Sequence, residues 1–326
     1  MIYKNQILEL FEQHGELSVK EITNKVDASR QMVHHAIKQL LEEGKVEKFG
    51  RPPKTIYKLK TTHLKQPDKV TISEADAKFL KNHFLLITEI GEMKAGLEGF
   101  SYWCSQRNLP VLKTMDEYIF TRKKYLKYFS SKEVIDGTDK LLNTEGFEKI
   151  WLQNVYYLDF YAIERFGKTR LGAPPHYAKQ GQNKFLMKII VDEIKERVHS
   201  FINNYGIDAV GFVPPTIRRE VQIMKFLREQ LQISLPIISL HKTSGLIPVP
   251  QKSLSKINER IRNAENTFAV TEQRRFNHVL LLDDAMGSGA TMNQIAKKIN
   301  NKQVANKVTG LAIVGSFKGF DVITDV

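Results

Sequence analysis

The sequence predicts an α/β protein with a mostly parallel, doubly wound sheet, a separate N-terminal domain and a helical connector between them. From about Phe147 onward, short apolar runs alternate with helix-length segments, as in repeated strand–helix–strand units. The first sixty residues instead carry three helical periods followed by two strand-like runs. A polar stretch with one proline, 61–72, separates the two patterns. The predicted domains are therefore 1–60, a linker and helical connector over 61–146, and 147–326.

Composition and charge narrow the class of protein. The only cysteine among the 326 residues is Cys104, which excludes an internal disulfide, and no Cys/His cluster offers a zinc site. No apolar run approaches the ~20 residues of a membrane span, so we expect a cytoplasmic protein without a membrane partner. The net charge of +13 attracts polyanions such as nucleic acid or nucleotides, although it does not choose among them, and general solubility is the alternative.

The N-terminal domain is expected to hold three helices and a β-hairpin. A capping box, Ser18 to Glu21, begins the second helix, and Ser29 caps the third. The strands of the hairpin are Lys45–Phe49 and Ile56–Leu59. The third helix is expected to turn its apolar side chains inward: Met32, Val33, Ala36, Ile37, Leu40 and Leu41.

This order of elements, with its basic hairpin tip, resembles the winged helix-turn-helix family over residues 1–60. The resemblance implies that the third helix lies in the major groove of DNA or of a structured nucleic acid, with the wing tip on the backbone or in the minor groove. The nucleic-acid-binding residues would be Ser29, Arg30, Gln31, His34, Lys38, Arg51 and Lys54. The alternative is an interaction wing, because winged helices also serve as dimerisation modules.

The connector has no catalytic motif. Helical periodicity runs from Ser73 to about Asn108 and again over Thr114–Tyr128. The second segment interleaves basic and aromatic residues, a composition typical of nucleic-acid-stacking surfaces. We favour a solvated helix with Tyr125 and Tyr128 turned inward. A helical connector or a dimerisation element, which would make the protein a homodimer, is the expectation.

The C-terminal domain is expected to place its ligand beyond the carboxyl ends of its parallel strands. That rule points to the loops after Val213 and Leu282. The predicted strands are Asn154–Tyr161, Ala209–Val213, Pro236–Leu240, His278–Leu282 and Val308–Val314, and the predicted helices are Phe185–Asn204, Ile217–Leu231 and Gln294–Ile299.

The segment from His278 to Thr291 carries the most specific signal. An apolar strand runs into two acids, then a loop of small residues, then the start of a helix. Glycines let backbone amides turn towards an anion, and the helix N-terminus adds partial positive charge. Two carboxylates at the end of the strand can accept hydrogen bonds from the vicinal hydroxyls of a sugar. The pattern predicts a site for a 5-phosphoribosyl group, and it is not a Walker A loop because no Gly-Lys-Ser/Thr follows.

This segment resembles the PRPP-binding signature of type I phosphoribosyltransferases. The resemblance implies that the two acids hold the ribose hydroxyls and that the loop amides hold the 5-phosphate, with Mg²⁺ bound through PRPP and not by the protein directly. Gly287 stands where the family often has Thr or Ser, a change that keeps the loop geometry. The phosphoribosyl-binding residues would be Asp283, Asp284, Gly287, Ser288, Gly289, Ala290 and Thr291.

Two upstream segments resemble the ComF-like branch of that family. Residues 251–268 look like its flexible loop, with Gln251, Arg260 and Asn263 as the matching positions. Residues 213–219 sit where the branch has its pyrophosphate loop, which implies diphosphate binding by Thr216, Arg218 and Arg219. The implied catalytic residues are Asp283, Asp284 and Arg260. A basic loop over residues 168–182 belongs either to a hood over the site or to a solvated surface.

Three functions fit these patterns. The first is a nucleic-acid-associated phosphoribosyltransferase, or a hydrolase acting at ribose C1 of PRPP or a nucleotide. The second is a transcription regulator that senses PRPP or a nucleotide without turnover, as the purine repressor of some bacteria joins these two domains. The third is an anti-phage effector of the retron type, restrained by a protein or ribonucleoprotein partner such as a reverse transcriptase. The sequence leans towards an enzyme because a lid with an arginine serves turnover.

Overall fold

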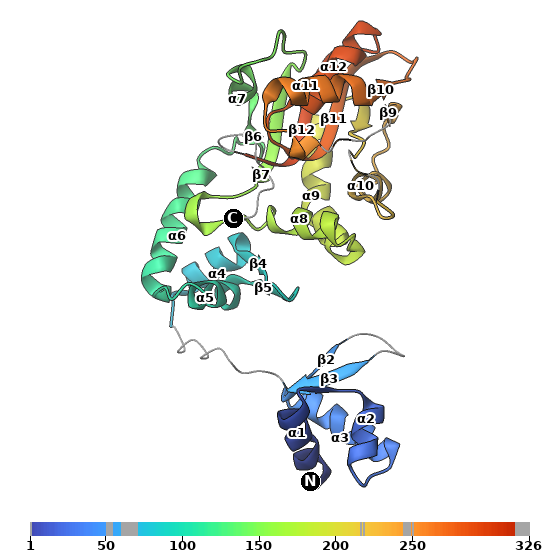
Figure 1. Cartoon of the computed structure of the whole chain (residues 1–326). Helices are drawn as coiled ribbons and strands as arrows, with labels where there is room; N and C mark the ends of the chain where they lie inside the picture. Colours follow the sequence, from blue (N-terminus) through green and yellow to red (C-terminus); the bar gives the residue numbers. More distant parts are fainter. Residues whose placement is uncertain are drawn as a thin grey trace. The chain divides into compact units, whose positions relative to one another are not determined.

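The computed structural model describes residues 2–49, 55–59, 71–215, 217, 219–243, 249 and 251–316. The chain forms two compact units, Met1–Val70 and Thr71–Val326 (Figure 1). The segment after residue 70, predicted to be a connector, lies in the same compact unit as the large sheet.

The N-terminal unit packs three helices against a three-stranded antiparallel sheet of order β1-β3-β2. Its elements are α1 (Ile2–His14), β1 (Glu16–Leu17), α2 (Val19–Lys25), α3 (Arg30–Glu42), β2 (Val46–Phe49) and β3 (Ile56–Leu59). The predicted capping box is present, since Ser18 and Glu21 bond each other's backbone amides. The core between the helices includes Ile7, Phe11 and Ile37.

One side chain of α3 was placed wrongly by the sequence pattern. Met32 is 45% exposed, whereas Val33, Ala36 and Ile37 are buried. The buried positions of α3 recur at spacings of three and four, which defines a single stripe along the helix. Met32 precedes that stripe by one residue, and one residue turns a helix by about 100°. Its thioether is therefore on the outer side of α3.

The larger unit is built on a five-stranded sheet of order β6-β7-β12-β11-β8. Only β6 runs antiparallel to its neighbour, so the predicted mostly parallel sheet is confirmed. The strands are β6 (Ile135–Asp136), β7 (Asn154–Phe160), β8 (Ala209–Phe212), β11 (Phe276–Met286) and β12 (Ala305–Gly315).

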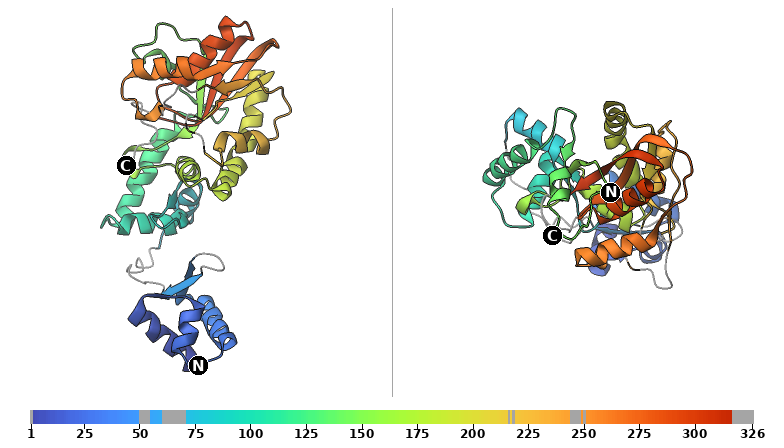
Figure 2. Two further views of the ribbon diagram at one scale, coloured as in Figure 1. Left: turned by 45° about the vertical axis from the view of Figure 1, so that its right-hand side comes forward. Right: turned by 90° about the horizontal axis from the view of Figure 1, so that it is seen from above.

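Helices cover both faces of this sheet (Figure 2). Along β11, Val279 and Leu281 pack into one apolar cluster, and Leu280 and Leu282 pack into the other. This alternation is the period of two of a β-strand. The first cluster contains α11 (Ile257–Thr267) and α12 (Ala290–Asn301), and the second contains α8 (Ala173–Gln180), α9 (Lys184–Tyr205) and α10 (Ile223–Gln230).

The strand order reverses next to β8. The amide of Ile238 donates to Val210, and Val210 donates to Pro236, so this segment extends the sheet beyond β8 on the side away from β11. The chain leaves β8 through α10 to this outer position, and then returns across β8 to enter β11. A reversal of this kind opens a crevice between the two strands at their carboxyl ends.

In the same region, two elements have other boundaries than the sequence predicts. The helix expected from Ile217 begins at Ile223. Just before it, the backbone amide of Val221 donates to the side chain of Gln182 at 2.8 Å and not to a carbonyl within a helix. The strand expected over Pro236–Leu240 is reduced to a single bridge at Ile237. Its remainder joins β9 (Leu240–Lys242), which pairs antiparallel with β10 (Phe268–Val270).

The prediction of a helical segment from Ser73 to about Asn108 is wrong in the middle of that range. A short hairpin of β4 (Leu85–Ile87) and β5 (Met93–Ala95) separates α4 (Glu74–His83) from α5 (Gly96–Ser105). Gly91 has a φ of +82°, in the left-handed region, and therefore supports a tight turn where a helix cannot continue. Leu85 and Ile87 are both buried and lie two residues apart, which is the spacing of a strand. The sequence pattern around them also fits a helix, so this signal was not recognised.

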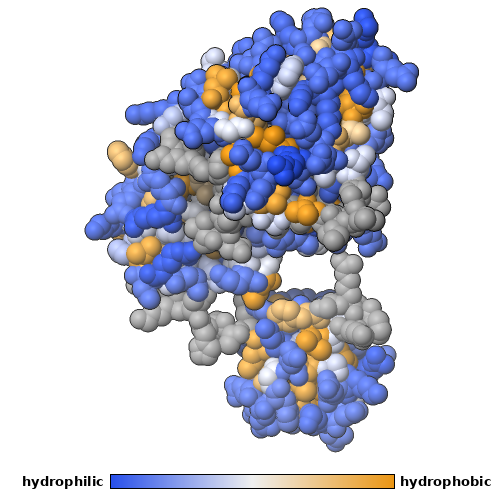
Figure 3. Space-filling model, turned by 45° about the horizontal axis from the view of Figure 1, so that its top comes forward, coloured by the Kyte–Doolittle hydropathy of each residue, from blue (hydrophilic) through white to orange (hydrophobic). Residues whose placement is uncertain are grey.

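The exposed side chains of the larger unit are mostly hydrophilic on the face in Figure 3. On α6 (Val111–Leu126), Tyr125 is buried, as expected, but Tyr128 just after the helix is 46% exposed. None of the described helices is both long enough and apolar enough to cross a bilayer.

A buried ion pair fastens α6 to the sheet. The guanidinium of Arg122 donates to both carboxylate oxygens of Asp159 at 2.9 and 3.0 Å, and both residues are buried. Asp159 lies near the carboxyl end of β7. The bidentate geometry satisfies the carboxylate, although Nε of Arg122 has no partner among the described residues.

We expect Arg122→Met to lower the free energy of unfolding by about 3 kcal/mol or more, because it leaves a buried carboxylate without its partner. Urea denaturation followed by tryptophan fluorescence measures the change. The double variant Arg122→Met/Asp159→Leu should recover much of the loss, because it removes both charges. Equal midpoints for wild type and Arg122→Met would show that the pair does not anchor α6.

Candidate functional site

The site is formed where β11 extends beyond the end of its neighbour β8. Pairing between the two strands ends at Leu282 opposite Phe212, whereas β11 stays paired with β12 as far as Met286. The predicted strand end at Leu282 was therefore too early. Asp283 and Asp284 are strand residues that project beyond β8, at the crevice where the strand order reverses.

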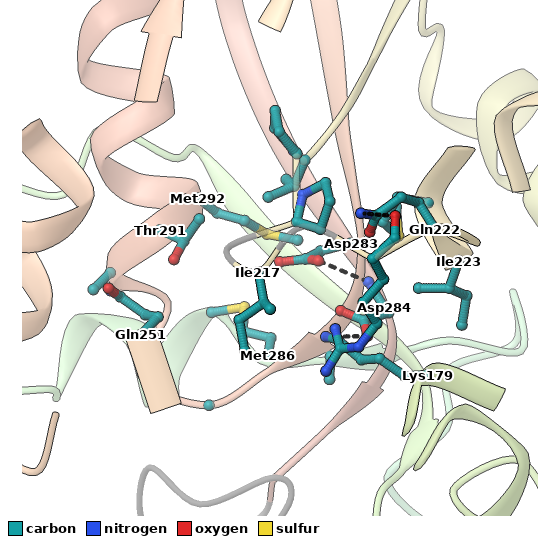
Figure 4. Close-up of a pocket in the computed structure, with 18 of the residues that line it drawn as sticks. Lys179, Ile217, Gln222, Ile223, Gln251, Asp283, Asp284, Met286, Thr291 and Met292 are labelled. Carbon is teal, nitrogen blue, oxygen red and sulfur yellow. Dashed lines mark hydrogen bonds and ion pairs between the residues drawn. The ribbon is translucent and has the colours of Figure 1, made fainter. Parts of the chain in front are cut away.

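The two carboxylates have different partners (Figure 4). Asp284, of which 5% is exposed, accepts a hydrogen bond at 2.6 Å from the ammonium of Lys179 on α8. Asp283 accepts a bond at 2.8 Å from the backbone amide of Asp284. Successive strand residues point to opposite faces, so Asp284 shares the face of α8 and α9, and Asp283 the face of α12.

This difference in partners separates the pKa values of the two acids. Burial, together with the negative charge of Asp284, raises the pKa of Asp283 well above its usual range. Burial acts in the same direction on Asp284, but the attraction and hydrogen bond of Lys179 outweigh it and lower the pKa of that carboxyl. Two neighbouring acids with divergent pKa values are typical of ligand-binding and catalytic sites.

A glycine loop and a helix N-terminus complete one wall. Gly289 precedes α12 with a φ of +79°, and a Cβ built there would lie 2.6 Å from both the Leu141 and the Met286 side chains. The amides that open α12 have no carbonyl partner within the helix. Ser288 donates no side-chain bond among those described, and its hydroxyl accepts from the amide of Ala290 at 3.4 Å. The loop therefore presents backbone donors to the pocket, where an anion would be stabilised.

Most of the predicted ligand-binding residues line one pocket of about 220 Å³. The pocket is lined by Asp283, Asp284, the whole loop Gly287–Thr291, and Arg219, Gln251 and Arg260 from two other segments. Thr216 and Arg218 lie outside the described residues. Asn263 does not line the pocket; its amide donates to the Gln251 side chain at 2.5 Å.

The segment predicted as a flexible loop contains a regular helix, α11. Its buried side is formed by Arg260, Ala264 and Thr267, at helical spacings of four and three. Arg260 Nε donates to the carbonyl of Leu254 at 2.6 Å, and its own carbonyl accepts from Gln251 at 2.7 Å. These bonds tie the segment before α11 to the helix itself.

The sequence reasoning missed the wall contributed by α8. His176, Lys179 and Gln180 line the pocket from this helix, and Gln222 lines it from the residue before α10. The sequence pattern of the stretch containing α8 fits either a hood over the site or a solvated loop. The signal that could have found the helix is the pair Pro174 and Pro175, because proline is favoured in the first turn of a helix.

The described residues contain no group of three His, Cys, Asp or Glu side chains suited to a metal ion. Mg²⁺ commonly takes one or two carboxylates and completes its shell with water and substrate phosphates. Asp283 and Asp284 place carboxylate oxygens beside the pocket, which is compatible with an ion held mainly by the phosphates of its ligand.

A second surface lies on the N-terminal unit. The outer side of α3 carries exposed Arg30, Gln31, His34 and Lys38, opposite the buried stripe. Ser29 is the N-cap, and its hydroxyl accepts from the amide of Met32 at 3.3 Å. The predicted wing residues Arg51 and Lys54 fall outside the described residues.

Comparison with known proteins identifies the N-terminal domain. A family model described as winged helix-turn-helix, DNA-binding, matches residues 2–47, so the predicted N-terminal DNA-binding domain is confirmed. No curated protein matches the chain. The chain therefore joins a winged helix-turn-helix DNA-binding domain to an α/β unit with a mostly parallel sheet.

We expect Arg30→Ala to weaken duplex DNA binding and to reduce the log–log salt slope by roughly one, as loss of one phosphate contact does. Fluorescence anisotropy across a salt series measures both effects. The matched control is Lys188→Ala on α9, which removes an equal charge from the other unit. Identical salt slopes for Arg30→Ala and wild type would contradict the assignment of α3.

We expect Gly289→Ala to destabilise the larger unit by about 1–2 kcal/mol from its left-handed φ, with a further cost from crowding against Leu141 and Met286. Gly206→Ala is the control, because Gly206 has a φ of +61° and open space around it. Thermal unfolding of both variants isolates the crowding. If both lose the same stability, the loop is not packed against Leu141.

Proposed function

We propose that the larger unit binds a phosphorylated ribose, with Mg²⁺-PRPP as the first ligand to test, and acts as a phosphoribosyltransferase or a related enzyme at ribose C1. The observation that carries the proposal is the position of Asp283 and Asp284. They stand at the crevice of the sheet, beside a glycine loop that opens α12. The two carboxylates can accept hydrogen bonds from the ribose hydroxyls, and the glycine loop beside them can bind the 5-phosphate. These are the two ends of a 5-phosphoribosyl group.

The surrounding cations support a diphosphate in the same pocket. Arg219 and Arg260 reach it from segments far apart in the sequence, and guanidinium groups bind phosphate oxygens in pairs. Mg²⁺ bound with PRPP would neutralise part of the departing charge. Asp284, kept ionised by Lys179, would stabilise positive charge developing on the ribose, and Asp283 would hold a sugar hydroxyl.

A sensor is the second candidate, and the position of Lys179 favours it. Lys179 lies on α8 and forms an ion pair with Asp284. The same helix contacts the hairpin that follows α4, through a bond of 3.2 Å from Tyr177 Oη to the carbonyl of Ile87. A ligand that displaces Lys179 would move α8 against this hairpin and could report occupancy to the rest of the chain. A restrained anti-phage effector would use the same pocket.

We expect Asp283→Asn/Asp284→Asn to weaken Mg²⁺-PRPP binding by roughly 100-fold or more, because hydrogen bonds to charged groups contribute about 1.5–3 kcal/mol each. Calorimetric titration measures the affinity, and pyrophosphate release with and without nucleobases tests for turnover. Asp192→Asn, an exposed residue paired with Lys188, is the control. Binding with release indicates an enzyme, and binding without release a sensor or a restrained effector. Unaltered affinity in the double variant would refute the assignment of the acids.

A further inference from the structure

A second lysine supports the glycine loop from behind. Lys140, on the short helix α7 (Thr138–Leu142), donates to the carbonyl of Gly287 at 3.1 Å and to the carbonyl of Ser316 at 2.8 Å. It also bonds the hydroxyl of Ser316. Ser316 follows the last residue of β12, so one ammonium joins the ends of the two central strands. Lys140 does not line the pocket.

The bond to Gly287 fixes the direction of the next amide. A trans peptide is planar, and its C=O and N–H point in opposite directions. With the carbonyl of Gly287 held on the side of Lys140, the amide of Ser288 is directed to the opposite side. Gly287 and Ser288 both line the pocket, which Lys140 does not. The lysine therefore aims a backbone donor at the anion cradle, and its charge polarises that peptide.

Among the described residues, the charge of Lys140 has no partner of opposite sign. No described carboxylate forms an ion pair with its ammonium, and its three acceptors are two carbonyls and a hydroxyl. The half-buried side chain also loses water, and this burial lowers the pKa of Lys140 to about 8. No charged group among the described residues contributes to that shift. A buried ammonium without a counter-ion is costly, so an anion bound on the other side of the peptide would offset the cost.

We propose that Lys140 is a positioning residue whose protonated amine orients the Gly287–Ser288 peptide for a phosphate and makes anion binding depend on its charge. This inference rests on the proposed phosphate site and adds the residue that regulates it. Anion binding stabilises the ammonium form, so binding raises the pKa of Lys140 and takes up protons near pH 8. Affinity is then highest below pH 8 and declines as the pH rises towards the pKa of the bound state.

The other ionisable groups around the loop must be separated from this effect. Asp139 neighbours Lys140 on α7, and Asp283 and Asp284 lie beyond the loop on β11, with Lys179 paired to Asp284. Burial raises the pKa of Asp283, so that carboxyl also responds to pH. Variants of Lys140 that keep both acids therefore distinguish the pH dependence caused by Lys140 from that caused by Asp283.

The experiment uses the full chain and two probes, Mg²⁺-PRPP and sulfate. The charge of sulfate does not change between pH 7 and 9. Calorimetric titration in two buffers of different ionisation enthalpy gives the affinity and the proton uptake. Each pKa unit that binding adds to Lys140 corresponds to roughly tenfold in affinity between its charged and neutral forms. We expect wild type to lose up to roughly tenfold in affinity for both probes from pH 7 to pH 9.

Variants distinguish positioning from simple structural support. Lys140→Met should bind both probes roughly tenfold more weakly at pH 7 and lose the proton uptake. Lys140→Arg, which stays charged, should bind well at both pH values. Lys302→Met is the control, because Lys302 also donates to a backbone carbonyl, that of Val270, away from the loop. Circular dichroism establishes that each variant is folded. If Lys140→Met fails to fold, the proton uptake of wild type and the affinity of Lys140→Arg test the role of Lys140 instead.

Each outcome bears on a different claim. If wild type binds PRPP without proton uptake near pH 8, or Lys140→Met binds both probes like wild type, the role of Lys140 is overturned and the proposed function stands. If sulfate binds with the expected pH dependence and PRPP does not, the anion cradle and Lys140 stand and the PRPP assignment fails. If wild type binds neither probe, both proposals fall.

Discussion

The extension of β11 past β8 is the constraint on which the site depends. Because β12 pairs with β11 as far as Met286, the last residues of β11 keep their strand geometry after β8 has ended. Strand geometry holds Asp283 and Asp284 on opposite faces at a fixed spacing, and the missing neighbour opens the space that they both line. Had β8 continued, its backbone would fill the crevice.

Each end of the site is supported by a lysine from a different layer. Lys179 reaches Asp284 from α8, and Lys140 reaches the carbonyl of Gly287 from α7. The first compensates a buried charge, and the second has no counter-charge in the part of the chain that the structure describes. The ligand proposed for this pocket would bring hydroxyls to the acids and negative charge to the loop. Lys179 lies 105 residues before Asp284, and Lys140 lies 147 residues before Gly287.

Much of the fold could be predicted because its signals are local. The capping box of Ser18 and Glu21 begins α2 as expected, and the apolar runs of β7, β11 and β12 identify the parallel core. The errors fall where a local pattern fits two structures. The residues Leu85–Ile87 continue an apolar period that suits a helix, yet Gly91 and packing against α5 make them a strand. Met32 is apolar, but it lies one position before the buried stripe of α3.

The sequence by itself determined the DNA-binding domain, the parallel sheet and the acidic strand end with its glycine loop, because each depends on residues close together in the chain. Only the tertiary structure decided which distant groups face that loop. Lys179, His176 and Lys140 carry no motif, and their roles arise from the packing of α7 and α8 around the ends of β11 and β12. Contacts between residues far apart in sequence depend on how the layers pack, and hydrophobic periodicity does not encode that partner choice.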